Sequence, residues 1–307
     1  MSNEFQKTDE RLAQLQRILN QEPSDKTWNE LCELLDTWSE NEGLAEALDY
    51  AEQRLTNWFD FYRKAPWSWR KNILQPPNPR LQIVRELSLF ARKIGDEGVS
   101  ELAQLPYLRN LTILSLEDNQ ITDVGAIALA HSPYLTNLKK LELPDNQIGF
   151  NGMQALAQST NFSKLAKLNL YNNKVGDEGT IALAQSPYLT TLTHLELFDN
   201  AITKTGVTAL AQSPNLSKLT MLDLSKNLIG DEGAAALAQS THLVSLEGLY
   251  LAFAQIGDEG VVALAQSSHL SKLVELDLQG NIFGREGNAA LINAGFSLDN
   301  QIWCRPD

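Results

Sequence analysis

The sequence predicts an α/β solenoid: a curved stack of about eight strand–helix units with a parallel sheet on its concave face and an all-α domain at its N-terminal end. Two observations predict the stack. An asparagine recurs every 27 residues from Asn119 to Asn227 and again at Asn281, and a glycine keeps the same interval from Gly98 to Gly287. A third observation sets the N-terminal domain apart, because residues 1–80 show no trace of this period. A fixed period of about 20–50 residues is typical of repeat proteins whose units stack on one another.

The N-terminal 80 residues are predicted to form three helices. Their apolar stripes are Leu12, Leu15, Ile18 and Leu19; then Trp28, Leu31, Leu35 and Trp38 after the start signal Pro23-Ser24-Asp25; then Leu44, Leu48, Ala51, Leu55, Trp58 and Tyr62 over about five turns. A terminal repeat needs a cover for its apolar end, so we expect these helices to cap the stack.

The domain boundary is placed after residue 80. The segment Gln75-Pro76-Pro77-Asn78-Pro79 is predicted to be a stiff linker. It divides an N-terminal helical cap domain, residues 1–80, from a repeat domain, residues 81–307, whose own C-terminal cap begins at about residue 295. Trp67 and Trp69 lie in a proline-flanked segment just before the linker. The sequence leaves two roles open for this pair: part of a small helical core that seals the solenoid, or a second, exposed docking patch.

Each repeat unit is predicted to contain a strand, a turn and a helix. In Leu168-Asn169-Leu170, apolar and polar residues alternate as in a strand. Asn173 follows at the turn, where its amide can satisfy backbone groups and stack through successive repeats. Gly179 opens the helix, and Asp177 and Glu178 suit the positive end of its dipole. Neighbouring strands are about 4.8 Å apart and packed helices about 8–10 Å apart, so the stack must curve with its strands inside.

The recurring frame LxxLxLxxNxI, seen in Leu141, Leu143, Asn146 and Ile148, is followed by helical stretches such as GDEGAAALAQS. In these motifs the chain resembles the ribonuclease-inhibitor-like subclass of leucine-rich repeat proteins, particularly its regular bacterial members. The resemblance covers roughly residues 84–300 and implies a right-handed solenoid. It implies no particular activity, because the family shares a shape rather than a function.

The composition of the chain limits the kinds of partner that it can bind and the cellular compartment in which we expect it. No stretch is apolar and long enough to cross a membrane, and no secretory signal is visible at the N-terminus. The formal net charge of −13 argues against nucleic acid and against anionic membrane surfaces. Two cysteines, Cys32 and Cys304, are too few for a disulfide framework. We therefore expect a cytoplasmic protein.

The sequence shows no catalytic constellation, so we expect a non-enzymatic protein without cofactor or metal. His131, His242 and His269 occupy repeat positions held elsewhere by glutamine or tyrosine, which leaves His194 alone on the predicted concave face. Cys32 has no histidine near it in the sequence to act as a base. Metal-ligand motifs are absent.

Residues on the concave face are free of packing constraints, so departures from the repeat there are informative. Carboxylates and aromatic side chains gather in its middle and later repeats. The predicted binding residues are Glu142, Tyr171, His194, Glu196, Phe198, Asp223, Tyr250, Phe253 and Asp277. This pattern predicts a recognition module, acting as adaptor, inhibitor or regulatory subunit, that binds another protein with a basic, partly apolar surface.

Two alternatives remain open at this point. Acidic residues with scattered aromatic side chains are also common on protein surfaces that have no binding role. The chain could instead be a sensor or delivered effector, in which the repeats select the target and the N-terminal helices are the signalling head.

Overall fold

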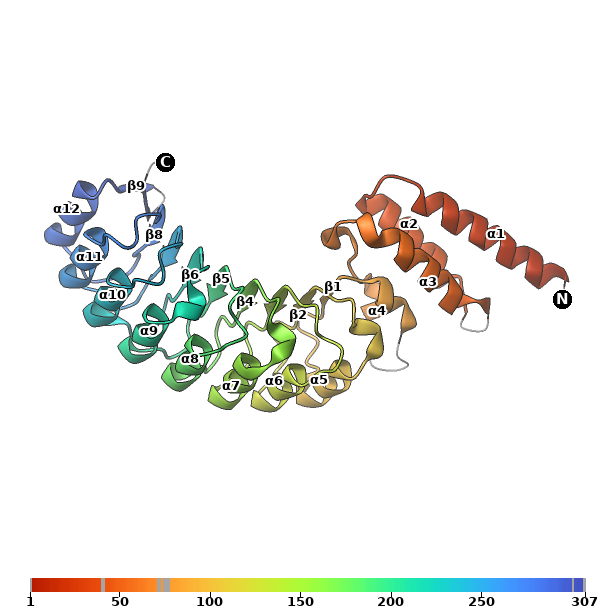
Figure 1. Ribbon diagram of the computed structural model, residues 1–307, viewed down its shortest axis with the longest axis horizontal. Helices are drawn as coiled ribbons and strands as arrows, with labels where there is room; N and C mark the ends of the chain where they lie inside the picture. Colours follow the sequence, from red (N-terminus) through yellow and green to blue (C-terminus); the bar gives the residue numbers. More distant parts are fainter. Residues whose placement is uncertain (1, 40–41, 71–72, 74–77, 300, 306–307) are drawn as a thin grey trace.

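A computed structural model describes residues 2–39, 42–70, 73, 78–299 and 301–305 of the 307-residue chain. Figure 1 shows a curved row of strand–helix units with a group of helices at its N-terminal end. These helices are α1 (Ser2–Leu19), α2 (Asp25–Asp36), α3 (Leu44–Arg54) and the short α4 (Trp67–Arg70). Residues 75–77 of the predicted linker lie outside the described residues.

The third N-terminal helix is shorter than predicted. It ends at Arg54 and is followed by two 3₁₀ turns, Leu55–Asn57 and Asp60–Tyr62, rather than continuing to Tyr62. Trp58, between these turns, has an extended backbone with ψ at 137°. The buried Arg63 side chain then donates to the carbonyl of Leu55, which a continuing helix would have used for its own hydrogen bond.

Eight parallel strands and eight helices make up the repeats, which confirms the predicted α/β solenoid. The strands are β1 (Glu86–Ser88), β2 (Ile113–Ser115), β3 (Lys140–Glu142), β4 (Lys167–Asn169), β5 (His194–Glu196), β6 (Met221–Asp223), β7 (Gly248–Tyr250) and β8 (Glu275–Asp277). The helices are α5 (Gly95–Ala103), α6 (Asp123–Ala130), α7 (Phe150–Gln158), α8 (Gly176–Ala184), α9 (Lys204–Ala211), α10 (Gly230–Ala238), α11 (Asp258–Ala265) and α12 (Arg285–Asn293). The strands lie on the inner side of the curve and the helices on the outer side (Figure 1).

The sheet ends in a different connection. After β8 come β9 (Ser297–Asp299) and β10 (Ile302–Cys304), and the spatial order is β8-β10-β9 with both pairings antiparallel. Phe296 and Trp303 are buried here, so this hairpin covers the last repeat.

The recurring asparagines form a column of amides, buried in all repeats but the last, and each links its own repeat to the one before it. Asn119, for example, donates through Nδ2 to the carbonyl of Leu89 at 2.8 Å, and its Oδ1 accepts the backbone N–H of Arg92 at 3.1 Å. At Asn146, Asn173, Asn200, Asn227 and Asn281, Nδ2 likewise donates to a leucine carbonyl of the preceding repeat, and Oδ1 accepts a backbone N–H of that repeat. The predicted role of this column is therefore confirmed.

The helical half starts three residues earlier than predicted, at Gly176 rather than Gly179 in α8. Gly179 lies inside the helix, where an added β-carbon would come within 2.8 Å of Val175 and 3.3 Å of Met153. The recurrence of this glycine therefore reflects close packing between adjacent repeats rather than a helix start.

The aspartate of each Gly-Asp-Glu-Gly motif caps the helix of the next repeat. Asp177 accepts the backbone N–H of Thr203 at 2.8 Å and of Gly206 at 3.0 Å, both at the start of α9. Asp96, Asp231 and Asp258 of the other motifs accept two such N–H groups each from the following repeat, and Asp123, at the same position in Thr122-Asp123-Val124-Gly125, accepts one. The carboxylate thus satisfies N–H groups that a helix leaves unpaired at its first turn.

The N-terminal helices are joined to the repeats through the sheet. The carbonyl of Arg63 accepts the N–H groups of Arg85 and Glu86, just as the carbonyl of Arg85 accepts those of Thr112 and Ile113 in the next repeat. The segment around Lys64 therefore lies beside β1 as a preceding repeat would.

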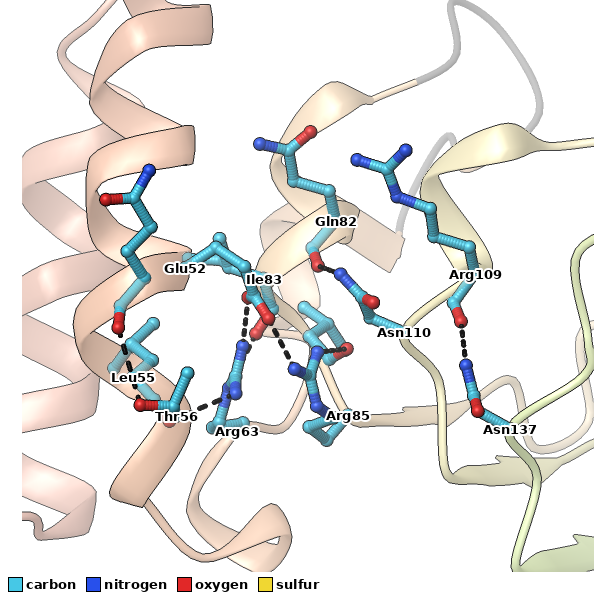
Figure 2. Close-up of polar contacts among 12 residues, drawn as sticks. Glu52, Leu55, Thr56, Arg63, Gln82, Ile83, Arg85, Arg109, Asn110 and Asn137 are labelled. Carbon is cyan, nitrogen blue, oxygen red and sulfur yellow. Dashed lines mark hydrogen bonds and ion pairs between the residues drawn. The ribbon is translucent and has the colours of Figure 1, made fainter. Parts of the chain in front are cut away.

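Figure 2 shows how buried side chains hold this junction. The Arg63 side chain, 1% exposed, donates to the carbonyls of Ile83 at 2.8 Å and Leu55 at 3.2 Å, and it also pairs with Glu52. Glu52 pairs in addition with Arg85. One apolar core continues from Leu15 in the N-terminal helices to Trp303 in the last hairpin.

Candidate functional site

Three columns of side chains run across the concave face of the sheet. The first column is the opening residue of each strand: Glu86, Ile113, Lys140, Lys167, His194, Met221, Gly248 and Glu275. The second is the closing residue: Ser88, Ser115, Glu142, Asn169, Glu196, Asp223, Tyr250 and Asp277. The third lies two residues further on: Phe90, Glu117, Pro144, Tyr171, Phe198, Ser225, Ala252 and Gln279. The unbroken register of the strands places each member of the first two columns beside its counterpart in the next repeat.

Of the four predicted carboxylates in the second column, Glu196 and Asp223 are neighbours, whereas Asn169 separates Glu196 from Glu142 and Tyr250 separates Asp223 from Asp277. Glu196 and Asp223 are direct partners across β5 and β6, about 4.8 Å apart along the sheet. Asn169 donates to Glu196 at 2.7 Å. Asp223 and Asp277 each also accept the N–H two residues further along their own chain, at 2.8 and 2.9 Å. Part of the hydrogen-bonding capacity of these two aspartates therefore supports the strand exit.

Burial and mutual repulsion make these carboxylates harder to ionise. The pKa of Glu196 is raised, first by burial and then by the nearby charges of Asp223 and Glu142. Burial also raises the pKa of Asp223. A positively charged partner group would relieve this repulsion.

The concave face is less uniformly acidic than the predicted residues alone suggested. Lys140 and Lys167 stand in the first column, and Lys140 pairs with Glu142 at 2.7 Å. His194 is in the same column, and burial together with these two lysines lowers its pKa. The prediction of an acidic face rests on the positions between and after the two leucines of each strand, whereas Lys140 and Lys167 precede the first leucine.

The predicted aromatic residues form two separate groups. Tyr171 and Phe198 stack with ring centroids 4.3 Å apart and planes at 12°, and Lys226 lies 5.0 Å above the Phe198 ring. Both rings are half-buried. Tyr250 instead turns toward Glu275 and donates its hydroxyl hydrogen to that carboxylate. Phe253, 52% exposed, lies against Gly280 rather than joining either group.

The predicted second patch is wrong for Trp69. This residue is 2% exposed and its indole N–H donates to Asp36 at 2.6 Å, because the segment forms the short helix α4 instead of a loop. Trp67 is 59% exposed, with the Arg92 guanidinium 3.9 Å from its ring centroid. Two further exposed aromatic residues, Phe59 and Phe61, were not predicted as part of this patch; their stacked rings have centroids 5.5 Å apart.

Two other side chains of the described residues could be reactive in principle, Cys32 and His194. Cys32 is buried, and that burial raises its thiol pKa. His194 accepts or donates one hydrogen bond, with Thr193 at 2.9 Å. Within the described residues, no group of three or more potential metal ligands is assembled, and no helix is long and apolar enough to span a bilayer.

Comparison with known families identifies the repeats. The leucine-rich repeat family matches six segments, residues 107–130, 134–157, 163–184, 188–211, 215–238 and 239–265. The chain is therefore a leucine-rich repeat protein. Its assignment to the ribonuclease-inhibitor-like subclass stays a prediction. A comparison with curated protein sequences gives no match.

A comparison with solved structures gives matches over about two thirds of the chain. An internalin from Listeria monocytogenes has 24% sequence identity and a TM-score of 0.44, over 69% of this chain and 66% of the internalin chain. A TDR receptor has 16% identity and a TM-score of 0.38, over 67% of this chain and 37% of its own. The ectodomain of the plant membrane receptor kinase GASSHO1/SCHENGEN3 from Arabidopsis thaliana, solved with CASPARIAN STRIP INTEGRITY FACTOR 2, has 18% identity and a TM-score of 0.34, over 67% and 25%. The chain thus spans less than two thirds of each of these proteins.

Proposed function

We propose that this protein is a non-enzymatic recognition module that binds another protein on its concave face. The stacked pair Tyr171 and Phe198 carries the proposal. These two half-exposed rings lie two residues beyond the ends of the neighbouring strands β4 and β5, the second of which ends at Glu196. Aromatic side chains held in place beside hydrogen-bonding groups are the type of residue that dominates binding energy at protein interfaces. An adaptor, inhibitor or regulatory subunit would use such a face.

Charge supports a partner with basic residues. The raised pKa values of Glu196 and Asp223 reflect repulsion and burial that a partner's cation would offset. The overall charge of −13 favours association with a basic surface over long distances.

The proposal is tested with a partner isolated by affinity capture from the native organism and identified by mass spectrometry. Phe198→Ala and Tyr250→Ala should each weaken binding by about 2 kcal/mol or more while leaving the fold unchanged. Tyr188→Ala, on the outer side of the solenoid, is the matched aromatic control and should bind like the parent. Glu196→Lys should mainly slow association, with a loss that shrinks as salt rises. Loss of binding in the outer variant alone would place the partner on the helical side and refute the proposal.

We further propose that residues 1–80 act as a cap rather than as an independent signalling head. The backbone pairing of Arg63 with the edge of β1 and the shared apolar core support this division of roles. A chain beginning at Leu81 should aggregate or fray at its first repeats, because Val84 and Leu87 would lose their cover. A monomeric product with unchanged thermal unfolding would favour the signalling-head alternative.

A further inference from the structure

A hollow lies on the concave face over the N-terminal ends of β5 to β8. Its volume is about 370 Å³, and its lining includes His194, Met221, Glu247, Gly248, Tyr250 and Glu275. It lies in the first column, away from the Tyr171–Phe198 stack, and most of its lining was not among the residues predicted from the sequence.

Gly248 and Tyr250 shape the hollow. Gly248 is the member of the first column without a side chain, so the column has a gap between Met221 and Glu275. The Tyr250 ring lies against Gly248, where an added β-carbon would be 3.1 Å from the ring carbon Cε2 and 3.3 Å from the hydroxyl. The hydrogen bond from Tyr250 to Glu275 fixes the ring as one wall. The gap therefore depends on glycine at position 248, and a larger residue there would displace the Tyr250 ring.

The hollow presents negative charge next to apolar surface. Glu247 and Glu275 are both exposed, whereas Met221 and the Tyr250 ring are half-buried. Among the described residues that line it, none is a lysine or arginine. The nearest lysine of the first column, Lys167, is three strands from Gly248, about 14 Å along the sheet. A long side chain with an apolar stem and a cationic end matches this arrangement.

We propose that this hollow receives an arginine side chain of the protein partner. The guanidinium stacks on the Tyr250 ring and donates to the carboxylates of Glu275 and Glu247, while the methylene stem contacts Met221. Arginine suits the site better than lysine, because its planar group both stacks on an aromatic face and forms paired bonds with carboxylates. This inference rests on the proposed function, and it names the chemistry by which the partner is recognised.

The test uses the methyl groups of methionine as reporters in the full-length chain. Met221 lies in the hollow, whereas Met153 is fully buried in the core and serves as an internal control. With ¹³C-methyl-methionine protein, titrating the capped tripeptide acetyl-Gly-Arg-Gly-amide should shift the Met221 signal to saturation, with a Kd of about 1–10 mM. The Met153 signal should stay in place. The same peptide with citrulline, which is neutral and of the same shape, should bind about tenfold more weakly.

Variants link the signal to the hollow. Gly248→Val should abolish the shift, because its side chain displaces the Tyr250 ring and fills the gap. Glu247→Gln keeps the shape and should weaken arginine binding while leaving citrulline binding unchanged. An unchanged Met153 signal shows that each variant is folded. Equal binding of the arginine and citrulline peptides, no shift of Met221, or full binding by folded Gly248→Val would each overturn the proposal.

The outcome is independent of the experiment on the whole partner. If the peptide does not bind but Phe198→Ala still weakens the partner complex, the arginine inference fails and the proposed function stands. If the peptide binds but variants of the concave face leave the partner complex intact, the proposed function fails.

Discussion

At the scale of single residues, Ala254 shows what the asparagine column contributes. Ala254 occupies the asparagine slot of its repeat and is fully buried. Its counterpart Asn227 makes bonds to the backbone of the preceding repeat, including the carbonyl of Leu197 and the N–H groups of Asn200 and Ile202. An alanine makes none of these side-chain bonds. One repeat later, the N–H groups of Asn227 and Ile229 therefore have no asparagine oxygen to accept them, and among the described residues the carbonyl of Leu224 accepts only from the Asn227 side chain of its own repeat, at 2.9 Å.

Removing an asparagine from the column and adding one to it should change the free energy of unfolding in opposite directions. Asn173→Ala should lower the free energy of unfolding by about 1–3 kcal/mol, because it leaves buried backbone groups unpaired. Ala254→Asn should raise it by about 1 kcal/mol by supplying the missing amide. Denaturant unfolding measures both. A loss of stability in Ala254→Asn would show that this slot cannot accommodate the asparagine geometry of its neighbours.

The Glu196 carboxylate should make stability depend on pH. Because burial and nearby carboxylates raise its folded-state pKa above the unfolded value, the folded chain holds this proton more tightly. The stabilisation is complete below the unfolded pKa and is lost as pH rises through the folded one. Glu196→Gln should therefore match the parent at about pH 3 and be more stable than it at about pH 7. Thermal unfolding at the two pH values checks this; equal stability at both would mean the carboxylate is fully solvated.

At the scale of the element, the capping aspartates decide how each following helix begins. Where the preceding repeat has an aspartate, as at Asp177, the next helix starts from an extended residue such as Thr203. Phe150 and Lys204 stand in the aspartate slot of their repeats, and the following helices α8 and α10 start instead from Gly176 and Gly230, whose φ angles are +63° and +61°. These glycines donate to the carbonyls of Asn200 and Ala254. A glycine with left-handed backbone therefore stands at the helix start where the aspartate cap is missing.

Removing one cap should destabilise one helix of the array. Asp177→Ala should cost about 1–2 kcal/mol, because two N–H groups at the start of α9 lose their acceptor. Glu178→Ala, at an exposed position in the same turn, is the control and should change stability by less than about 0.5 kcal/mol. Hydrogen exchange would locate the effect at Thr203 to Gly206. If the two variants lose equal stability, the capping role is refuted.

The sequence predicted the elements of the repeats better than it predicted the site. Strict periodicity fixes which leucines face the core, so the strands and the asparagine column followed from residues such as Leu168 and Asn173 alone. Periodicity alone did not predict which groups Asp177 binds, because its carboxylate caps the helix of the next repeat and not the helix of its own repeat. The hollow at Gly248 was missed for a similar reason: its walls come from neighbouring strands, and the direction of the Tyr250 ring is set by Glu275. Burial of Trp69 depends on Asp36, which is 33 residues away.

At the scale of the whole molecule, each repeat is bonded mainly to its neighbours, so a complete unit should be removable. Deleting Leu192–Lys218 should leave a folded, shorter solenoid, because Asn173 then meets Asn227 and Asp177 meets Gly230. Deleting the thirteen residues Leu192–Lys204 should unfold the array, because the strands lose register. Circular dichroism and unfolding curves compare the two products. Equal damage from both deletions would contradict nearest-neighbour stacking.

The replacement of asparagine by alanine at position 254 also has a mechanical consequence. Pulled from its ends, a stack of turns lengthens like a coil spring and yields first where adjacent turns share the fewest bonds. The turn between β6 and β7 lacks the asparagine links present at Asn200, Asn227 and Asn281, although Ser225 supplies one bond to Ala252. Under tension we expect the first opening at this turn, next to the hollow at Gly248, and at a higher force in Ala254→Asn. An optical trap would record the difference, and an unchanged first yield would place the softest turn elsewhere.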